Sequence, residues 1–377
     1  MRHVYLHVPF CRRRCTYCDF SIAVRRDVPA ERYVSAVSSE LERRQATDWW
    51  DNEPLETLYL GGGTPSLLPP SSLASLIRDL TARCAAAGAP AVPDAELTIE
   101  VNPEDVTDEA AATWVGAGVN RVSLGVQSFD PSVLEWMHRS HSAEQAEEAV
   151  RVLRAAGIGS VSLDLIFALP VELKRNWSDD LRRALDVEPD HLSLYGLTVE
   201  PRTPLARRIA RGATSTPVDG TFAEQFLEAH DALTSAGFEH YEVSNYSRPG
   251  HRSRHNQAYW IGRPYLGLGP SAHGYDGARR YWNRAPWSAY EQVLKAGGDP
   301  TESVEHLTPA QRRLETVYLG LRTVEGLPSG LPAGWPEGWR QSAAQRGWLD
   351  EAGGRVRLTP EGWLRLDAIV AVLTTSG

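Results

Sequence analysis

The sequence contains few cysteines, only four among 377 residues, and three of them stand close together in CRRRCTYCDF at residues 11–20. So few thiols in so long a chain exclude a disulfide-stapled framework of the kind that small secreted proteins use. We therefore expect a cytoplasmic protein whose cysteines stay reduced and available to a metal. The fourth cysteine, Cys84, falls in a predicted helix, where we expect a small core residue.

Long basic blocks and long apolar runs are also missing. The formal net charge is −9 and the longest basic block is Arg12-Arg13-Arg14, which excludes broad nucleic-acid binding because a phosphate backbone needs an extended basic face. No uncharged stretch reaches the roughly 18 residues of a membrane-spanning helix, and the N-terminal apolar stretch is too short for a signal peptide. Any contact with a membrane is expected to be peripheral.

The chain does contain a regular alternation of short β-rich runs with longer amphipathic stretches. The β-rich runs lie at residues 4–10, 56–61, 96–101, 120–126, 160–167, 191–197 and 240–246. Strands that alternate with helices predict a parallel sheet, and six or seven such units fit a barrel better than an open two-layer sheet. The predicted fold class is α/β, a partial (βα)6-type TIM barrel.

The alternation ends near residue 250 and divides the chain into three predicted parts. Residues 1–250 form the barrel, and residues 251–297, rich in Gly, His and aromatic residues, form a linking segment. Residues 298–377 are predicted to form a C-terminal helical module that resembles a winged helix, because a short strand and turn precede the closing helix.

The distinctive motifs accompany the predicted strands. The three clustered cysteines follow the first strand, GGGTP (61–65) follows the second and GVQSFD (125–130) the fourth, while EVNPED (100–105) and DLIFALP (164–170) accompany the third and fifth. Active-site residues of such barrels gather at the carboxyl ends of the strands. We therefore expect one composite site.

The spacing C-x3-C-x2-C of Cys11, Cys15 and Cys18 allows three thiolates to wrap one small inorganic centre. Soft sulfur ligands favour zinc or an iron–sulfur cluster. Three thiolates leave one iron of a four-iron cluster open for chemistry, whereas a structural zinc site needs a fourth ligand such as His7. Both interpretations stay open on the spacing alone.

The cysteine spacing, with Tyr17 before the third cysteine and GGGTP after the next strand, resembles the radical S-adenosylmethionine (radical SAM) superfamily. The resemblance implies that SAM binds the open iron of a [4Fe–4S] cluster through its amino and carboxylate groups and is cleaved by an electron from the cluster. A glycine-rich turn suits this role because its backbone N–H groups can approach a small zwitterion without interference from Cβ atoms.

The similarity extends through YLHVPFC, SLDLIFALP and HLSLYGLTVEPRTPL to the branch that contains oxygen-independent coproporphyrinogen III oxidase (HemN) and the heme chaperone HemW. In that branch, residues matching Tyr5, Gly62 and Glu100 contact the cluster-bound SAM. The residues of a neighbouring site, which holds a second SAM in the oxidase, match Tyr17, Gly63, Thr64, Gln127, Arg139, Asp164 and Thr198.

Position 20 and the motif HNQAYW favour the chaperone subgroup. Phe20 stands where the oxidase has a further cysteine, and only ten residues precede Cys11, where the oxidase has a long arm. HNQAYW matches the H-N-x-x-Y-W signature associated with heme binding, which implies heme contacts from His255, Asn256, Tyr259 and Trp260. A neutral imidazole is a good axial ligand for heme iron, so His255 is the expected ligand and His273 the second candidate.

The resemblance thus implies a heme chaperone with a [4Fe–4S] cluster, SAM and heme as cofactors, supplied by an electron donor and delivering heme to acceptor proteins. Whether SAM is cleaved productively stays open. The alternatives are a radical SAM methyltransferase or cyclopropane-forming enzyme, the oxidase itself, and a zinc-stabilised carrier of porphyrin without catalytic activity.

Two positions depart from the family pattern. ALPVEL (168–173) stands in place of GLPGQT, near the expected SAM site, and Arg202 replaces the glycine of EPGT. The planar guanidinium of Arg202 is able to meet a porphyrin carboxylate. The basic block Arg12–Arg14 is able to offset the charge of a thiolate-bound cluster or to meet an electron donor.

Overall fold

The computed structural model describes residues 2–47, 53–331 and 338–374, and its centre is a nine-stranded sheet in the order β11-β1-β4-β5-β6-β7-β8-β10-β9. Six consecutive neighbours pair in parallel: β1 (His3–Val8), β4 (Thr57–Gly62), β5 (Glu96–Val101), β6 (Arg121–Gln127), β7 (Ser160–Phe167) and β8 (His191–Gly196). β11 (Leu266–Leu268) joins β1 in parallel, whereas β10 (Asn245–Ser247) and β9 (Glu239–Glu242) are antiparallel. Within the described residues the two edge strands, β11 and β9, do not pair with each other, so the sheet is an open, partial barrel, as predicted.

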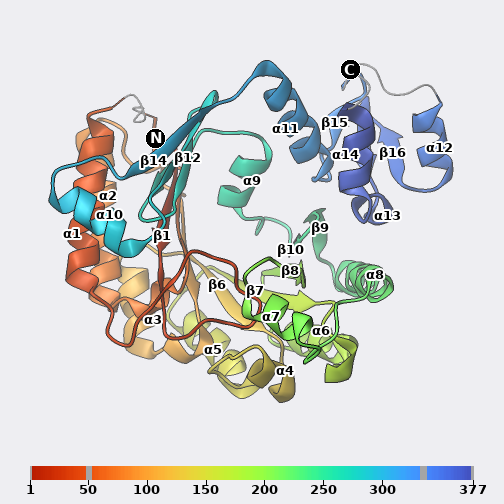
Figure 1. Ribbon diagram of the computed structural model, residues 1–377, viewed down its shortest axis with the longest axis horizontal. Helices are drawn as coiled ribbons and strands as arrows, with labels where there is room; N and C mark the ends of the chain where they lie inside the picture. Colours follow the sequence, from red (N-terminus) through yellow and green to blue (C-terminus); the bar gives the residue numbers. More distant parts are fainter. Residues whose placement is uncertain (1, 48–52, 332–337, 375–377) are drawn as a thin grey trace.

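Helices cover the outer side of this curved sheet (Figure 1). The helices that follow successive strands are α1 (Ala30–Gln45), α2 (Pro70–Ala86), α3 (Asp108–Gly116), α4 (Pro131–Trp136), α5 (Ala143–Ala155), α6 (Trp177–Asp186), α7 (Pro204–Ala210) and α8 (Asp219–Ser235). Several begin at side-chain caps: Thr107 accepts a hydrogen bond at the start of α3, and Ser142 with Gln145 forms a capping box at the start of α5. Local sequence therefore sets where these helices begin.

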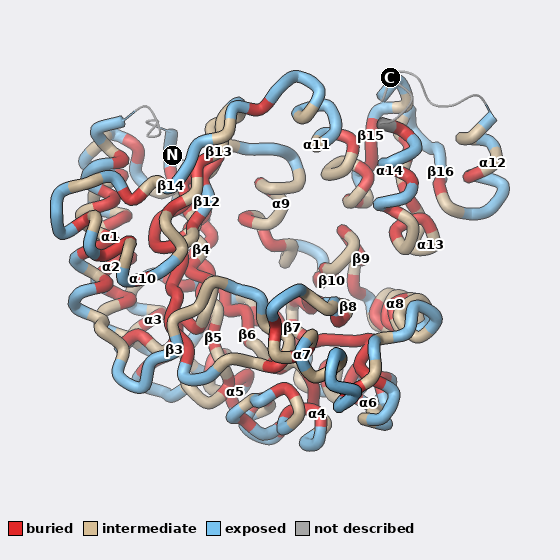
Figure 2. The backbone as a smooth tube through the Cα atoms, viewed as in Figure 1, coloured by how far each residue is buried: buried red, intermediate tan, exposed pale blue. Residues whose placement is uncertain are grey.

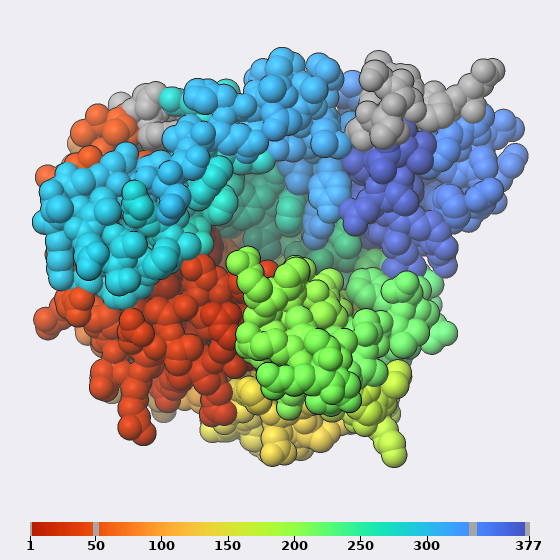
Figure 3. All heavy atoms as spheres, in the orientation of Figure 1, coloured from red at the N-terminus to blue at the C-terminus, as the bar shows by residue number. Residues whose placement is uncertain are grey.

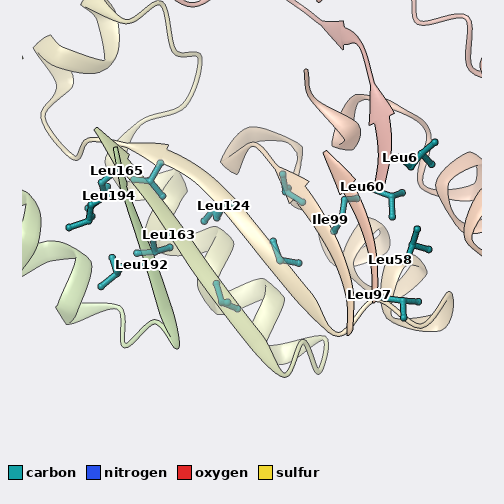
Figure 4. Packing of buried hydrophobic residues seen from close by; sticks show 14 of the residues in the cluster. Leu6, Leu58, Leu60, Leu97, Ile99, Leu124, Leu163, Leu165, Leu192 and Leu194 are labelled. Atoms are coloured by element: carbon teal, nitrogen blue, oxygen red, sulfur yellow. The ribbon is translucent and has the colours of Figure 1, made fainter. Parts of the chain in front are cut away.

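The hydrophobic core lies between the sheet and the helices, and Figure 4 shows the leucines that the strands contribute. In β7 the alternating residues Val161, Leu163 and Leu165 are fully buried in this core. Their neighbour Asp164 points to the opposite face, because side chains alternate across a strand. Figure 2 shows the buried strands within a more exposed shell of helices. The inner face of the sheet is consequently polar, and it carries the site described below.

Cys84 of α2 belongs to the buried core, which confirms its predicted role.

The remaining elements of the chain form smaller units. β2 (Phe10–Cys11) and β3 (Ala23–Val24) form a small two-stranded parallel sheet. Short 3-10 helices lie at Pro65–Leu67, Pro103–Asp105 and Val171–Leu173. The middle of the chain holds α9 (Arg254–Trp260), α10 (Trp287–Lys295) and the antiparallel sheet of β12 (His273–Tyr275), β13 (Arg279–Asn283) and β14 (Thr301–His306).

The C-terminal part is helical with a small three-stranded antiparallel sheet, as predicted for a winged-helix-like module. It contains α11 (Pro309–Leu321), β15 (Leu327–Pro328), α12 (Trp339–Gln345), β16 (Leu349–Ala352), β17 (Arg355–Leu358), α13 (Pro360–Trp363) and α14 (Leu366–Thr374). Part of the predicted module, residues 332–337 and 375–377, lies outside the described residues.

The predicted domain boundaries at residues 250 and 297 stay predictions. β11, from the linking segment, pairs with β1 of the barrel, and β14, from beyond residue 297, pairs with β13 of that segment. Across the described ranges we find no helix with the length and apolarity needed to cross a bilayer.

Candidate functional site

A cavity of about 390 Å³ opens at the carboxyl ends of the parallel strands. Twelve of the thirteen residues predicted for the cluster and for SAM line it, contributed by successive strand ends: Cys11, Cys15, Tyr17, Cys18, Gly62, Gly63, Thr64, Glu100, Gln127, Arg139, Asp164 and Thr198. Tyr5 does not line the cavity; its ring stacks on Tyr59, with centroids 6.1 Å apart. Phe20 lines the cavity entrance and is 58% exposed.

The cysteine loop is closed at its base, because Phe10 and Cys11 pair with Ala23 and Val24. On the front of the molecule this N-terminal segment lies beside the green segment that contains α7 (Figure 3), and the Leu205 amide donates to the Thr16 carbonyl at 2.8 Å. These contacts hold both flanks of the loop. Its three cysteines line the same cavity, although among the described residues they do not form a group close enough to hold a single metal ion.

Hydrogen-bond donors point at two of the cysteine sulfurs. The Thr64 hydroxyl lies 3.5 Å from Cys11 Sγ, and a guanidinium nitrogen of Arg139 lies 3.6 Å from Cys15 Sγ. Such donors stabilise the electron-rich sulfur of an iron–sulfur centre. A Cβ atom at Gly63 would lie 3.0 Å from Cys11 Sγ and 2.8 Å from the Phe10 carbonyl, which explains why glycine is needed there.

The amide groups of this glycine turn are already engaged within the protein. The Gly62 amide donates to Glu100 at 2.9 Å and the Gly63 amide donates to the Val8 carbonyl at 2.8 Å. The expectation that these two N–H groups approach a ligand is therefore not met. The glycines instead allow close packing of the turn against the cysteine loop.

The donor set fits an iron–sulfur cluster better than a zinc site completed by His7. The three thiols of the cavity are free, and burial raises the pKa of Cys11 to about 11, so binding of a metal would have to displace its proton. His7 does not line the cavity. Its ring nitrogens lie 3.2 Å from the Tyr5 hydroxyl and 3.3 Å from the Ser21 carbonyl, which leaves no ring nitrogen facing the cysteines.

Two partly buried carboxyl groups line the cavity. Glu100 accepts hydrogen bonds from the Tyr59 hydroxyl and the Gly62 amide, both at 2.9 Å, and burial together with the charge of Asp164 raises the pKa of Glu100 to about 7. Asp164 accepts from the Ser123 hydroxyl at 2.9 Å, and burial raises its pKa to about 6. Both groups are placed to accept hydrogen bonds from hydroxyl groups of a ligand.

Arg139 is held rigidly between these groups and the cysteines. Its guanidinium donates to Asn102 Oδ1 at 2.6 Å and to the Gly125 carbonyl at 2.7 Å. Burial alone would lower the pKa of Arg139, but the neighbouring Tyr17 and Cys15 raise it, so the side chain stays charged. This is a fixed cation in the cavity rather than a solvated surface charge.

The backbone at Gln127 is in the left-handed region, with φ 68°, where β6 shifts its register against β7. That irregularity accounts for its local conformation. Sequence reasoning missed three residues that hold the predicted site residues by hydrogen bonds: Tyr59 contacts Glu100, Asn102 contacts Arg139 and Ser123 contacts Asp164. Each lies in or beside a strand and resembles an ordinary sheet residue.

The two departures from the family pattern lie outside the main cavity. Residues 168–173 do not line it, and Glu172 instead accepts hydrogen bonds from Thr214 and Ser215. Arg202 is exposed, with φ 68°, in a neighbouring depression that also includes Arg14 and Phe20. Arg12 pairs with Asp105 at 3.0 Å, and Arg13 lines the cavity itself.

The predicted heme residues lie at the other end of the sheet. His255 contacts Thr57, the first residue of β4, whereas the cavity residue Gly62 is the last residue of that strand. His255 is 1% exposed, with Nδ1 2.7 Å from the Thr57 hydroxyl and Nε2 2.8 Å from the Tyr259 hydroxyl. Burial lowers the pKa of His255 to about 3, so the imidazole is neutral.

The other residues of this group, Asn256, Tyr259 and Trp260, belong to α9 itself. The backbone N–H of Asn256 donates to the Ser253 hydroxyl at the start of the helix, and the Trp260 ring lies under the Arg322 guanidinium at 4.5 Å. His273, the second candidate ligand, is exposed and stacks on Trp282. The structure therefore separates the heme motif from the cysteine-lined cavity.

Comparison with known proteins agrees with this architecture. Residues 5–184 match the model of the radical SAM superfamily. The chain is 40% identical to the heme chaperone HemW of Mycobacterium tuberculosis, over 98% of this chain and 94% of that one, and 37% identical to HemW of Synechocystis over 86% and 78%. Coproporphyrinogen III oxidase (HemN) from Escherichia coli has the same fold, with a TM-score of 0.81 over 99% of this chain and 90% of that chain at 22% identity. The chain therefore belongs to the HemW family of the radical SAM superfamily.

Proposed function

We propose that this protein is a heme chaperone, which binds heme and delivers it to acceptor proteins. The observation that carries the proposal is the 40% identity to a HemW heme chaperone over nearly the whole chain, since it includes both the cysteine-lined cavity and α9. Membership of the radical SAM superfamily implies a [4Fe–4S] cluster and SAM, and the cavity offers residues suited to both.

In this proposal Cys11, Cys15 and Cys18 hold three irons of the cluster. When bound, the cluster supplies an electron to SAM at its open iron. Glu100 accepts hydrogen bonds from the ribose hydroxyls, and the fixed charge of Arg139, with Asp164, orients a ligand in the adjoining part of the cavity. The exposed Arg13 and the half-buried Arg14 beside the cysteines give an acidic electron donor a place to approach.

Heme is proposed to bind at α9, with His255 as its axial ligand. A ring nitrogen must be free for this, yet both are hydrogen-bonded in the structure and the side chain is buried. Ligation of heme iron therefore requires one ring nitrogen of His255 to be released from its present partner, Thr57 or Tyr259.

Transfer of heme tests the proposal. The anaerobically reconstituted protein is loaded with heme, freed of excess by gel filtration and mixed with a heme-free b-type cytochrome. We expect heme to appear in the cytochrome from the wild type. The His255→Ala variant should retain less heme, whereas His273→Ala should behave as the wild type.

Two results would contradict the proposal: no retained heme in the wild type, or transfer no faster than from free heme. Production of S-adenosylhomocysteine with a methylated product, without transfer, would point instead to a methyltransferase.

A further inference from the structure

A depression of about 500 Å³ adjoins the cysteine-lined cavity at the surface of the protein. The N-terminal segment and the segment that contains α7, which lie side by side in Figure 3, both contribute to its walls. Cys18, Asp19, Phe20 and Glu200 line the depression and the cavity alike. A molecule seated in the depression would therefore contact the wall of the cysteine-lined cavity.

The depression gathers positive charge in a protein whose formal net charge is −9. It is lined by Arg14, Arg202 and Arg207, and Arg13 lines the cavity beside it. Across the described ranges, none of these four arginines forms an ion pair, whereas arginines elsewhere, such as Arg183 with Glu147 and Arg280 with Glu315, are paired with carboxylates.

The three arginines of the depression keep most of their hydrogen-bond donors available. Arg14 donates to the Cys18 carbonyl at 3.2 Å and Arg207 donates to the Arg202 carbonyl at 3.3 Å. A guanidinium has five N–H donors in a planar fork, so each side chain is still able to bind a carboxylate of a partner. Asp19 and Glu200 are the acidic residues of the depression, and they reduce its positive charge without pairing with these arginines.

Two further features favour an interface at this depression. Phe20, on its rim, is 58% exposed, and aromatic and arginine side chains are both enriched where proteins contact one another. Arg202 has φ 68°, a conformation that disfavours every residue with a Cβ atom. The chain thus holds an arginine at a backbone position where glycine would be less strained.

We propose that this depression docks an acidic one-electron carrier protein, whose surface carboxylates pair with Arg14, Arg202 and Arg207. The inference rests on the proposed function, which needs an electron at the cluster. The carrier is oxidised by one electron, the cluster is reduced by it, and no bond forms or breaks. Electron transfer weakens steeply with distance, and Cys18 places the depression directly beside the cavity.

The shape of the depression favours a protein partner over a membrane, because a bilayer surface is flat whereas the three arginines surround a hollow. Complexes of electron carriers are typically small and transient, which suits a contact of this extent. Carboxylates on the carrier would also steer its approach, so the association rate should depend on salt.

Surface plasmon resonance with flavodoxin and with a plant-type ferredoxin, two acidic one-electron carriers, tests the docking on the anaerobically reconstituted protein. At least one carrier should bind the wild type saturably, and more weakly at high salt. The double variant Arg202→Gly with Arg207→Gln should raise the Kd about tenfold, mainly by slowing association. Glycine suits φ 68°, so this variant should fold as the wild type does.

The matched control is Arg151→Gln with Arg182→Gln. It removes the same charge from exposed positions of α5 and α6 that do not line the depression, and it should change the Kd less than about twofold. A wild type that binds neither carrier would overturn the docking, and so would a double variant that binds as tightly as the control.

Binding of phosphatidylglycerol vesicles that the double variant loses, without binding of either carrier, would also overturn the docking and assign the arginines to a membrane. Failure of the proposed function is distinguishable, because heme transfer to the cytochrome is measured separately. A wild type that binds the carrier but does not transfer heme would refute the proposed function and leave the docking surface standing.

Discussion

At the scale of single residues, Glu100 combines burial with a nearby negative charge. These two causes raise its pKa to about 7, against hydrogen bonds from Tyr59 and Gly62 that act in the opposite direction. A carboxyl group whose pKa is higher in the folded than in the unfolded chain binds its proton more tightly when folded. Its contribution to stability is therefore complete below about pH 4.5 and is lost as the pH rises through about 7.

Glu100→Gln removes this titration. The free energy of unfolding of the variant, relative to that of the wild type without ligands, should therefore increase by about 1–3 kcal/mol between pH 5 and pH 8. Urea unfolding at the two pH values measures this difference. A difference that stays constant with pH would show that Glu100 is not held with a raised pKa.

The cysteines make a second prediction at this scale. Cys15→Ala removes one of the three thiols that line the cavity, and we expect it to abolish the iron and sulfide content after anaerobic reconstitution. Cys84→Ala is the matched control, because Cys84 is buried in the core away from the cavity, and it should keep both. Iron and sulfide at wild-type levels in Cys15→Ala would refute the ligand assignment.

At the scale of elements, the contact between β4 and α9 depends on the Thr57 hydroxyl. It lies 3.0 Å from His3 Nδ1 and 2.7 Å from His255 Nδ1, and all three side chains are buried. Thr57→Val leaves both imidazoles without this partner, so we expect a loss of about 1–3 kcal/mol in the free energy of unfolding.

A neighbouring threonine supplies the control. Thr98 of β5 pairs in register with Tyr59 and is fully buried, but within the described part of the chain its hydroxyl has no hydrogen-bond partner. Thr98→Val should therefore be neutral or slightly stabilising in the same urea experiment. Equal effects of the two substitutions would contradict the role given to Thr57.

The sequence predicted the elements of the barrel but not the position of α9. Apolar runs bounded by turn residues predict strands such as β7. The cysteine spacing is specific to a small inorganic centre. The motif HNQAYW was placed only in a linking segment, whereas residues 254–260 form a helix that packs His255 against β4. Contacts between residues about 200 positions apart, such as Thr57 with His255, depend on how the sheet curves and leave no local pattern.

At the scale of the whole molecule, the C-terminal part is joined to the barrel through a buried ion pair. Arg322, at the end of α11, contacts Glu242 of β9 at 2.7 Å and also covers the Trp260 ring. Glu242 is fully buried, so Arg322→Leu leaves a carboxylate without its cation and should destabilise the protein by about 3–5 kcal/mol.

The double variant Arg322→Leu with Glu242→Gln removes the uncompensated charge and should recover part of that loss. A double-mutant cycle of unfolding free energies measures the coupling between the two side chains. Independent, additive effects would show that this ion pair does not join the two parts of the chain. The pair itself was not predictable, since neither residue belongs to a motif.

The central claim is that this chain binds heme through α9. Its most direct test is a titration of the anaerobically reconstituted protein with heme, followed by the Soret band. The account predicts a saturable, near-stoichiometric change that His255→Ala weakens and that His273→Ala does not. A wild-type titration without saturation, or an unchanged affinity and spectrum in His255→Ala, would contradict it.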